Sequence, residues 1–322
     1  GIRIHYLVRE KNVELFDRID TITKYSLAYC SEKLFKYPYR NFTVVDFGPG
    51  AGGLELPGLV SIAIPESRSG RTLDYFEHTI AHEVAHQWFY ATIATNEFEE
   101  PWLDEGLTSY FTARIARSSD HMNGFIGLFG YDISMDEIFR TFALMGKTPY
   151  PINLKSWEYP GFMNYNSAVY TRALLVLQTL EVMIGDSVFA GALKDFAEDY
   201  RFSHPDGNDF LSSISSSTGL DLSDFFSQFV SGTARVDYGV TSLKYDEVSG
   251  VSQDAAVKYK ITVEVRRELD GVVPQKITVG LIDGAKIDTS WDGRSGEASY
   301  EFMADSKPWY ACIDEENESP LD

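Results

Sequence analysis

The chain has 322 residues, 44% of them hydrophobic, which predicts a sizeable core in one large domain or two smaller ones. A net charge of −20 argues against nucleic acid as a partner, because basic residues drive binding to phosphates. The two cysteines, Cys30 and Cys312, exclude a disulfide-dense scaffold, and we expect no membrane-spanning segment.

The first part of the chain predicts strands around one long helix. Residues 2–8 alternate weakly, and residues 41–47 and 59–64 are rich in β-branched and aromatic side chains, as strands are. Apolar residues recur every three to four positions over residues 12–35, which predicts a helix. The glycines and prolines of residues 48–58 predict a long turn without regular structure.

The middle of the chain predicts a mostly helical domain, and the end predicts strands. Residues 120–163 read as loop-rich, and from about residue 231 the apolar period changes to two, with Asp-Gly turns. We therefore expect an α+β protein, with a mostly helical domain over residues 1–232 and an all-β sandwich over residues 233–322. Besides residues 12–35, the predicted helices of the first domain cover residues 69–93, 102–117, 170–185, 186–200, 208–215 and 222–230.

The string His-Glu-x-x-His at residues 82–86 indicates a metal site. Residues four apart lie on one face of a helix, so His82 and His86 can direct two imidazoles at one metal ion. Zinc accepts such nitrogen ligands, and a catalytic site usually has three protein ligands. Glu83 lies beside the first ligand, where its carboxylate can take a proton from water.

The third ligand predicted for this site is Glu105, nineteen positions after His86 and on the next predicted helix. Taken alone, Glu105 reads as a carboxylate at a helix start, where it suits the helix dipole. Two helices joined by a loop can bring their facing sides together, and two histidines with a glutamate form a known catalytic zinc arrangement. We therefore expect one zinc ion per chain.

These segments resemble a known family. His-Glu-x-x-His followed by eighteen residues and a glutamate is the zinc signature of gluzincin metallopeptidases, and residues 82–89 and 102–106 resemble the zinc-site segments of the aminopeptidase N family. Residues 52–59 occupy the place of its Gly-Ala-Met-Glu-Asn motif. Residues 170–173 lie where the family has Tyr-x-Lys-Gly, and residues 225–230 resemble the end of its catalytic domain.

Several positions depart from the family pattern. Leu54, Leu56 and Pro57 replace Met, Asn and Trp, which bears on side-chain preference, while Arg172 and Ala173 replace Lys and Gly. The resemblance implies a thermolysin-like catalytic domain followed by the family's small β-domain. The family's N-terminal β-domain and C-terminal helical domain have no counterpart here, so we expect further domains in a longer parent protein.

The resemblance also implies roles for the site residues. Zinc is held by His82, His86 and Glu105, Glu83 is the general base, and Tyr170 donates a hydrogen bond to the developing oxyanion. By residue type alone, Tyr170 is one of 19 tyrosines and reads as a core residue.

The remaining roles concern the peptide. Glu55 binds the free α-ammonium group of the substrate, which is largely charged at neutral pH. Gly52 and Gly53 let the peptide backbone approach a strand edge, and Leu54 follows them in the motif. Tyr165 lies where some family members place a pocket tyrosine.

Three functions remain open at this point. The first is a zinc aminopeptidase that removes the N-terminal residue of peptides with a free N-terminus. The second is a zinc endopeptidase in which Glu55 is only a turn residue. The third is a catalytically weak peptide-binding module. The sequence leaves the compartment open, cytoplasmic or extracytoplasmic.

Overall fold

The computed structural model describes residues 1–49, 52–64, 74–120, 122, 126–128, 131–145, 150–248, 258–315 and 321. The chain divides into two compact units, Gly1–Phe226 and Ser227–Asp322. From the change of hydrophobic period, the sequence predicted a domain boundary after residue 232. The assignment of the two domains stays a prediction.

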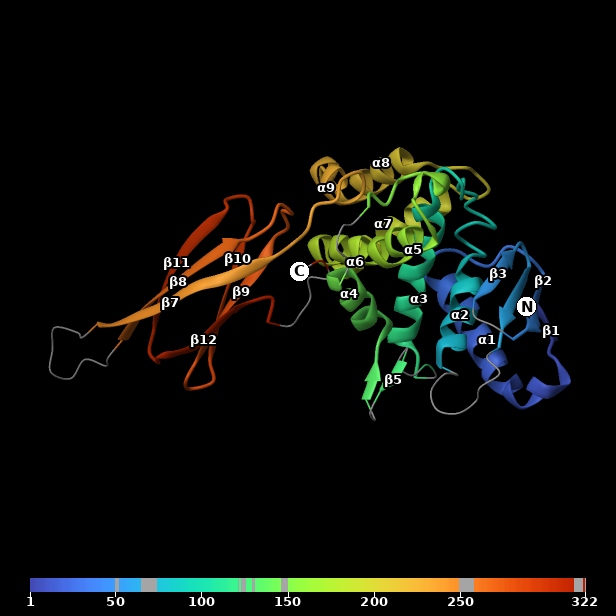
Figure 1. Ribbon diagram of the computed structural model, residues 1–322, viewed down its shortest axis with the longest axis horizontal. Coiled ribbons are helices and arrows are strands. Elements are labelled where there is room, and N and C mark those ends of the chain that lie inside the picture. Colours follow the sequence, from blue (N-terminus) through green and yellow to red (C-terminus); the bar gives the residue numbers. More distant parts are fainter. Residues whose placement is uncertain are drawn as a thin grey trace. The chain divides into compact units, whose positions relative to one another are not determined.

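A four-stranded sheet begins the first unit, with helices α1 and α2 side by side next to it (Figure 1). The strand order is β1-β2-β4-β3, in which β1, β2 and β4 are parallel and β3 is antiparallel to β4. Phe42 and Val44 alternate into the core along β2, which is why this stretch forms a strand. The strands are β1 (Arg3–Leu7), β2 (Asn41–Gly48), β3 (Gly53–Leu56) and β4 (Leu59–Ala63).

The prediction of a turn over residues 48–58 is wrong for four of its residues. Gly53–Leu56 forms strand β3, which pairs with β4 from Gly53 opposite Ile62 to Leu56 opposite Leu59. Gly58 has φ of +78°, a left-handed conformation that glycine adopts at low cost, and it reverses the chain tightly enough for this pairing. Strand β3 therefore forms one edge of the sheet.

The rest of the first unit is mainly helical, as predicted. The stretch read as loop-rich also contains α4 and a small hairpin, Ile126–Leu128 (β5) with Tyr131–Ile133 (β6). The α-helices are α1 (Phe16–Lys33), α2 (Asp74–Ala85), α3 (Leu107–Ser118), α4 (Met135–Met145), α5 (Phe162–Asn166), α6 (Ala173–Ile184), α7 (Asp186–Asp199), α8 (Gly207–Thr218) and α9 (Ser223–Phe229). A 3₁₀ turn, Glu10–Leu15, precedes α1.

Helix α2 ends earlier than the sequence predicted. The expected helix ran to residue 93, but α2 stops at Ala85, and the next backbone bonds reach back only three residues, from Gln87 N to Val84 O and from Trp88 N to Ala85 O. The chain then turns, because Ala91 N bonds His86 O at 2.9 Å and the Thr92 hydroxyl bonds Gln87 O at 2.8 Å. The apolar side chains of this turn are buried without being helical.

Two π-helical turns open α3 and α6. These are η3 (Trp102–Gly106) and η5 (Ser167–Arg172), and they pack against each other. Gly106 makes the approach possible, because a Cβ atom there would lie 2.7 Å from the Cβ of Ala173. π-Helical turns are rare and occur frequently at functional sites.

The stretch Phe162–Ile184 joins α5, η5 and α6 into one apolar helical segment. Among the described residues it is long and apolar enough to cross a membrane, and 67% of its apolar window is buried within the protein. Such burial is that of a core helix in a folded domain. The absence of a membrane-spanning segment stays a prediction.

The second unit consists of two three-stranded antiparallel sheets, ordered β10-β9-β12 and β11-β8-β7. Ile261, Val263 and Val265 alternate into the core along β8, which follows the predicted period of two. The rings of Tyr238 and Trp291 meet edge to face at 5.2 Å and join the two sheets. The strands are β7 (Tyr238–Val248), β8 (Lys258–Arg267), β9 (Gln275–Leu281), β10 (Lys286–Trp291), β11 (Glu297–Ala304) and β12 (Pro308–Ile313).

Candidate metal centre

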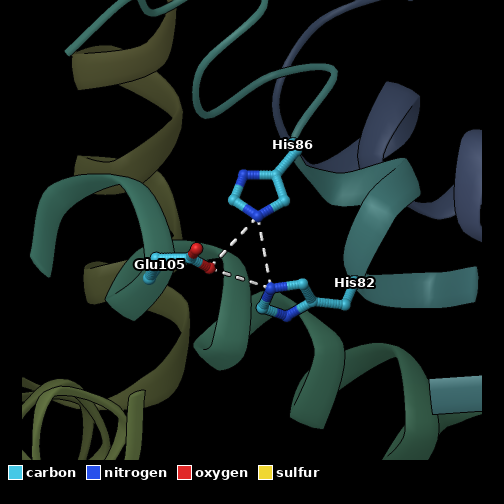
Figure 2. A group of neighbouring side chains, drawn as sticks. All are labelled: His82, His86 and Glu105. Atoms are coloured by element: carbon cyan, nitrogen blue, oxygen red, sulfur yellow. Dashed lines mark hydrogen bonds and ion pairs between the residues drawn. The ribbon is translucent and has the colours of Figure 1, made fainter. Parts of the chain in front are cut away.

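Three of the predicted site residues converge on one point in the first unit (Figure 2). His82 lies on α2, His86 directly follows that helix, and Glu105 lies on η3. Glu105 Oε2 is 3.0 Å from His82 Nε2 and 3.2 Å from His86 Nε2, and the two Nε2 atoms are 3.2 Å apart. The spacing of four places both imidazoles on one side of the helix, and the packing of η3 adds the carboxylate.

This donor set fits a divalent metal ion. Two imidazole nitrogens and one carboxylate oxygen are ligands that zinc accepts in catalytic sites, and all three face the same small volume. Two further carboxylates lie close by. A carboxylate oxygen of Glu55 and one of Asp104 are each within 4.8 Å of a ring nitrogen of His86. The arrangement can therefore hold a metal ion in negatively charged surroundings.

The ring of His86 is held by groups on its other nitrogen. Its Nδ1 lies 3.0 Å from Phe89 O, 2.9 Å from Asp104 Oδ1 and 3.2 Å from Thr108 Oγ1. If Nδ1 carries the proton, it donates to the Phe89 carbonyl. The lone pair of Nε2 is then free and faces His82 and Glu105. These contacts come from the turn after α2 and from η3 and α3, so helical periodicity did not reveal them.

Burial and charge shift the protonation of the three ligands. Burial lowers the pKa of His82, which favours the neutral imidazole that binds metals. Burial by itself would lower the pKa of His86. The negative charges of Asp104 and Glu105 have the larger effect, and the pKa of the His86 ring is raised. Burial would raise the pKa of Glu105, yet the charge of His86 and the hydrogen bond with His82 hold it well below its usual value.

Glu83 points into the same region as a buried carboxylate. It is 4% exposed, and its Oε2 atom has no hydrogen-bond partner among the described residues. Burial, together with the charges of Glu55 and Glu105, raises the pKa of Glu83 to about 8 against the opposing charge of His86. A carboxyl group in such surroundings binds a proton readily, as a general base must.

Gly53 has a structural role that its place in the sequence motif did not reveal. A Cβ atom at Gly53 would lie 2.5 Å from Cδ of Glu83, so the Glu83 side chain passes directly over the glycine. The absence of a side chain on this residue of β3 therefore gives the carboxylate its position.

Tyr170 reaches the centre from η5. Its hydroxyl donates a short hydrogen bond to Glu105 Oε1, and its ring stacks on that of His82 at a centroid distance of 5.9 Å. Burial and the charge of Glu105 raise the pKa of Tyr170, so the phenol stays protonated. Tyr165 meets Tyr170 edge to face at 6.1 Å and Tyr159 at 5.5 Å.

Strand β3 brings Glu55 to the centre. By the alternation of a strand, Glu55 turns towards His86 and Asp104, while Leu54 is 53% exposed. Gly52 precedes the strand with φ of +90°, a conformation that favours glycine. No hydrogen bond or ion pair joins the carboxylate of Glu55 to another residue in the described part of the chain, so it can receive a cationic group.

Two residues close enough to Glu55 to be affected by its charge, Tyr90 and Glu97, were missed by sequence reasoning. Tyr90 adopts φ of +112°, which is rare for a bulky side chain and marks the turn after α2. Its pKa is raised by burial and then by the charges of Glu97 and Glu55. Burial and the charge of Glu55 likewise raise the pKa of Glu97. Neither residue carries a periodic or motif signal that would have identified it.

Comparisons with known proteins place these residues in a family. Residues 22–229 match the model of the Peptidase family M1 domain. "Probable aminopeptidase 1" of Sulfurisphaera tokodaii is 23% identical over 208 residues, which is 62% of this chain and 26% of that protein. "Aminopeptidase N" of Lactococcus lactis is 24% identical over 201 residues, or 59% of this chain and 23% of that protein.

A solved structure has a similar fold. The crystal structure of Legionella pneumophila aminopeptidase A in complex with aspartic acid superposes with a TM-score of 0.69 at 19% identity, over 99% of this chain and 36% of that one. The matched part of this chain thus spans only about a quarter of the first two curated relatives, 26% and 23% of their lengths.

Proposed function

This chain belongs to peptidase family M1, and from that membership we propose that it is the catalytic part of a zinc-dependent aminopeptidase acting on peptides with a free N-terminus. The observation that carries the proposal is the convergence of His82, His86 and Glu105 beside the buried carboxylate of Glu83. In this proposal, residues 1–232 form a thermolysin-like catalytic domain and residues 233–322 a β-sandwich domain.

The metal ligands of the proposal are His82 and His86 through Nε2, and Glu105 through Oε2, which already face one another. When bound, the zinc ion supplies Lewis acidity that polarises the scissile carbonyl and makes a water molecule more acidic. Phe89 O holds the ring of His86 in the orientation that this binding needs.

Glu83 moves the proton in the proposed reaction. Its carboxylate takes a proton from the attacking water and passes it to the nitrogen of the leaving amine. The raised pKa of Glu83 brings the group close to neutral pH, where both transfers are feasible. Its position against Gly53 places it next to the strand on which the substrate would lie.

Tyr170 supplies a hydrogen-bond donor for the oxyanion that develops on the scissile carbonyl. A donor of this kind is worth about 3 kcal/mol in comparable sites. The high pKa of the buried phenol keeps its proton available throughout the neutral range.

Glu55 determines which bond is cut. Its carboxylate would hold the α-ammonium group of the peptide, which fixes the first peptide bond at the metal centre. The peptide would add to the open edge of β3, with Gly52 and Gly53 allowing close approach and Leu54 and Tyr165 bordering the bound residue.

The test compares an amino-acid anilide with an N-blocked peptide, each with and without a chelator. We expect turnover of the anilide only, its loss with the chelator, and its loss in Glu83→Gln although that variant still binds zinc. Turnover of the N-blocked peptide would instead favour an endopeptidase. Zinc binding without turnover of either substrate by the wild type would favour a peptide-binding module.

A further inference from the structure

Tyr170 contacts two of the proposed ligands at once. Its hydroxyl donates to Oε1 of Glu105, while the other oxygen of that carboxylate, Oε2, is the atom that faces His82 and His86. Its ring lies nearly parallel to the ring of His82, with an interplanar angle of 22°. The side chain therefore touches the ligands themselves, before any substrate is present.

The backbone holds Tyr170 in this place. Glu105 and Tyr170 lie on the facing π-turns η3 and η5, and Gly106 packs against Val169 and Ala173 on either side of Tyr170. Tyr165 packs edge to face on the ring of Tyr170. The ring of Tyr170 thus packs against both His82 and Tyr165.

We infer that Tyr170 is a positioning residue of the metal centre, which engages Oε1 of Glu105 and leaves Oε2 facing His82 and His86, where a metal ion would be held. Without the hydroxyl, the Glu105 carboxylate loses its orienting hydrogen bond and can rotate about its last torsion. The hydroxyl has a single proton, so this role belongs to the substrate-free centre, and the same proton would turn to the oxyanion only when a substrate is bound. The inference rests on the proposed zinc site.

The test measures zinc affinity by competition between the metal-free protein and a chromogenic chelator at fixed pH. Loss of a partner that orients a metal ligand typically weakens binding about 10- to 100-fold, and we expect a loss in this range for Tyr170→Phe. Tyr200→Phe is the control, since it removes a hydroxyl that bonds Asp209 Oδ1, which is not a proposed ligand, and its zinc affinity should equal that of the wild type.

A double-mutant cycle assigns the effect to Glu105. In a Glu105→Ala background, Tyr170→Phe should weaken zinc binding much less than in the wild type, because no acceptor remains for the hydroxyl to orient. The phenyl ring keeps the packing, and the zinc-induced rise in unfolding temperature, taken against each protein's own metal-free form, gives a second measure even if the variant is less stable.

The outcomes separate the two proposals. If the wild type binds zinc and Tyr170→Phe binds it equally well, or if the loss is the same in the Glu105→Ala background, the positioning role is refuted while the proposed function stands. If the wild type binds no zinc, the proposed function itself fails and this inference fails with it.

Discussion

The close packing of the two π-turns can be tested with Gly106→Ala. Gly106 has φ of −69° and ψ of −46°, so alanine meets no backbone strain there. Its new Cβ, however, would lie 2.7 Å from the Cβ of Ala173 and 3.4 Å from Val169 O. The first contact is too close for two carbon atoms, and the turns that carry Glu105 and Tyr170 must move apart.

The magnitude follows from that distance. Carbon atoms pack best at about 3.5–4.0 Å, so the turns must separate by roughly 1 Å. Overpacking destabilises the folded protein by about 1–3 kcal/mol. Replacing glycine by alanine in a helix stabilises it by about 1 kcal/mol. Stability should therefore fall by at most about 2 kcal/mol. A misplacement of about 1 Å can lower activity about 100-fold, so activity should suffer far more than folding.

The rescue variant makes this prediction specific. With Ala173→Gly added, the nearest atom of that residue to the new methyl group is its Cα at 3.9 Å, an ordinary contact. We expect kcat/KM of Gly106→Ala to fall about 100-fold and to recover largely in Gly106→Ala/Ala173→Gly, with unfolding curves showing the smaller stability changes. Full activity of the single variant, or no recovery in the double variant, would refute the reasoning.

Three further predictions follow from other contacts. Gly53→Ala should displace Glu83 and lower kcat while zinc content, measured by metal analysis, stays that of the wild type. A chelator should lower the unfolding temperature, because zinc at 100 times its dissociation constant stabilises the native state by about 2.7 kcal/mol. Burial would raise the pKa of Asp46, but hydrogen bonds from Arg9 and Asn12 lower it. Its carboxylate therefore contributes stability that is fully present above its unfolded pKa of about 3.9 and is lost as the pH falls through the lower folded value. Urea unfolding at decreasing pH should show this loss in the wild type and less of it in Asp46→Asn.

The sequence predicted local elements well where one period ran undisturbed. The alternation in β8 and the recurrence of apolar residues in α7 and α8 follow from backbone geometry, which repeats within each segment. The errors lie where a segment's conformation depends on hydrogen bonds that its own sequence period does not specify. Strand β3 exists because β4 offers a partner, and α2 stops early because the following turn finds hydrogen bonds elsewhere.

The candidate site divides in the same way. The spacing of His82 and His86 on one helix face, with Glu83 between them, was determined by the sequence itself, because helical period is a property of neighbouring residues. The contact between Tyr170 and Glu105 lies across 65 positions and depends on how two segments pack. Only the tertiary structure could decide it, since no local rule links residues so far apart along the chain.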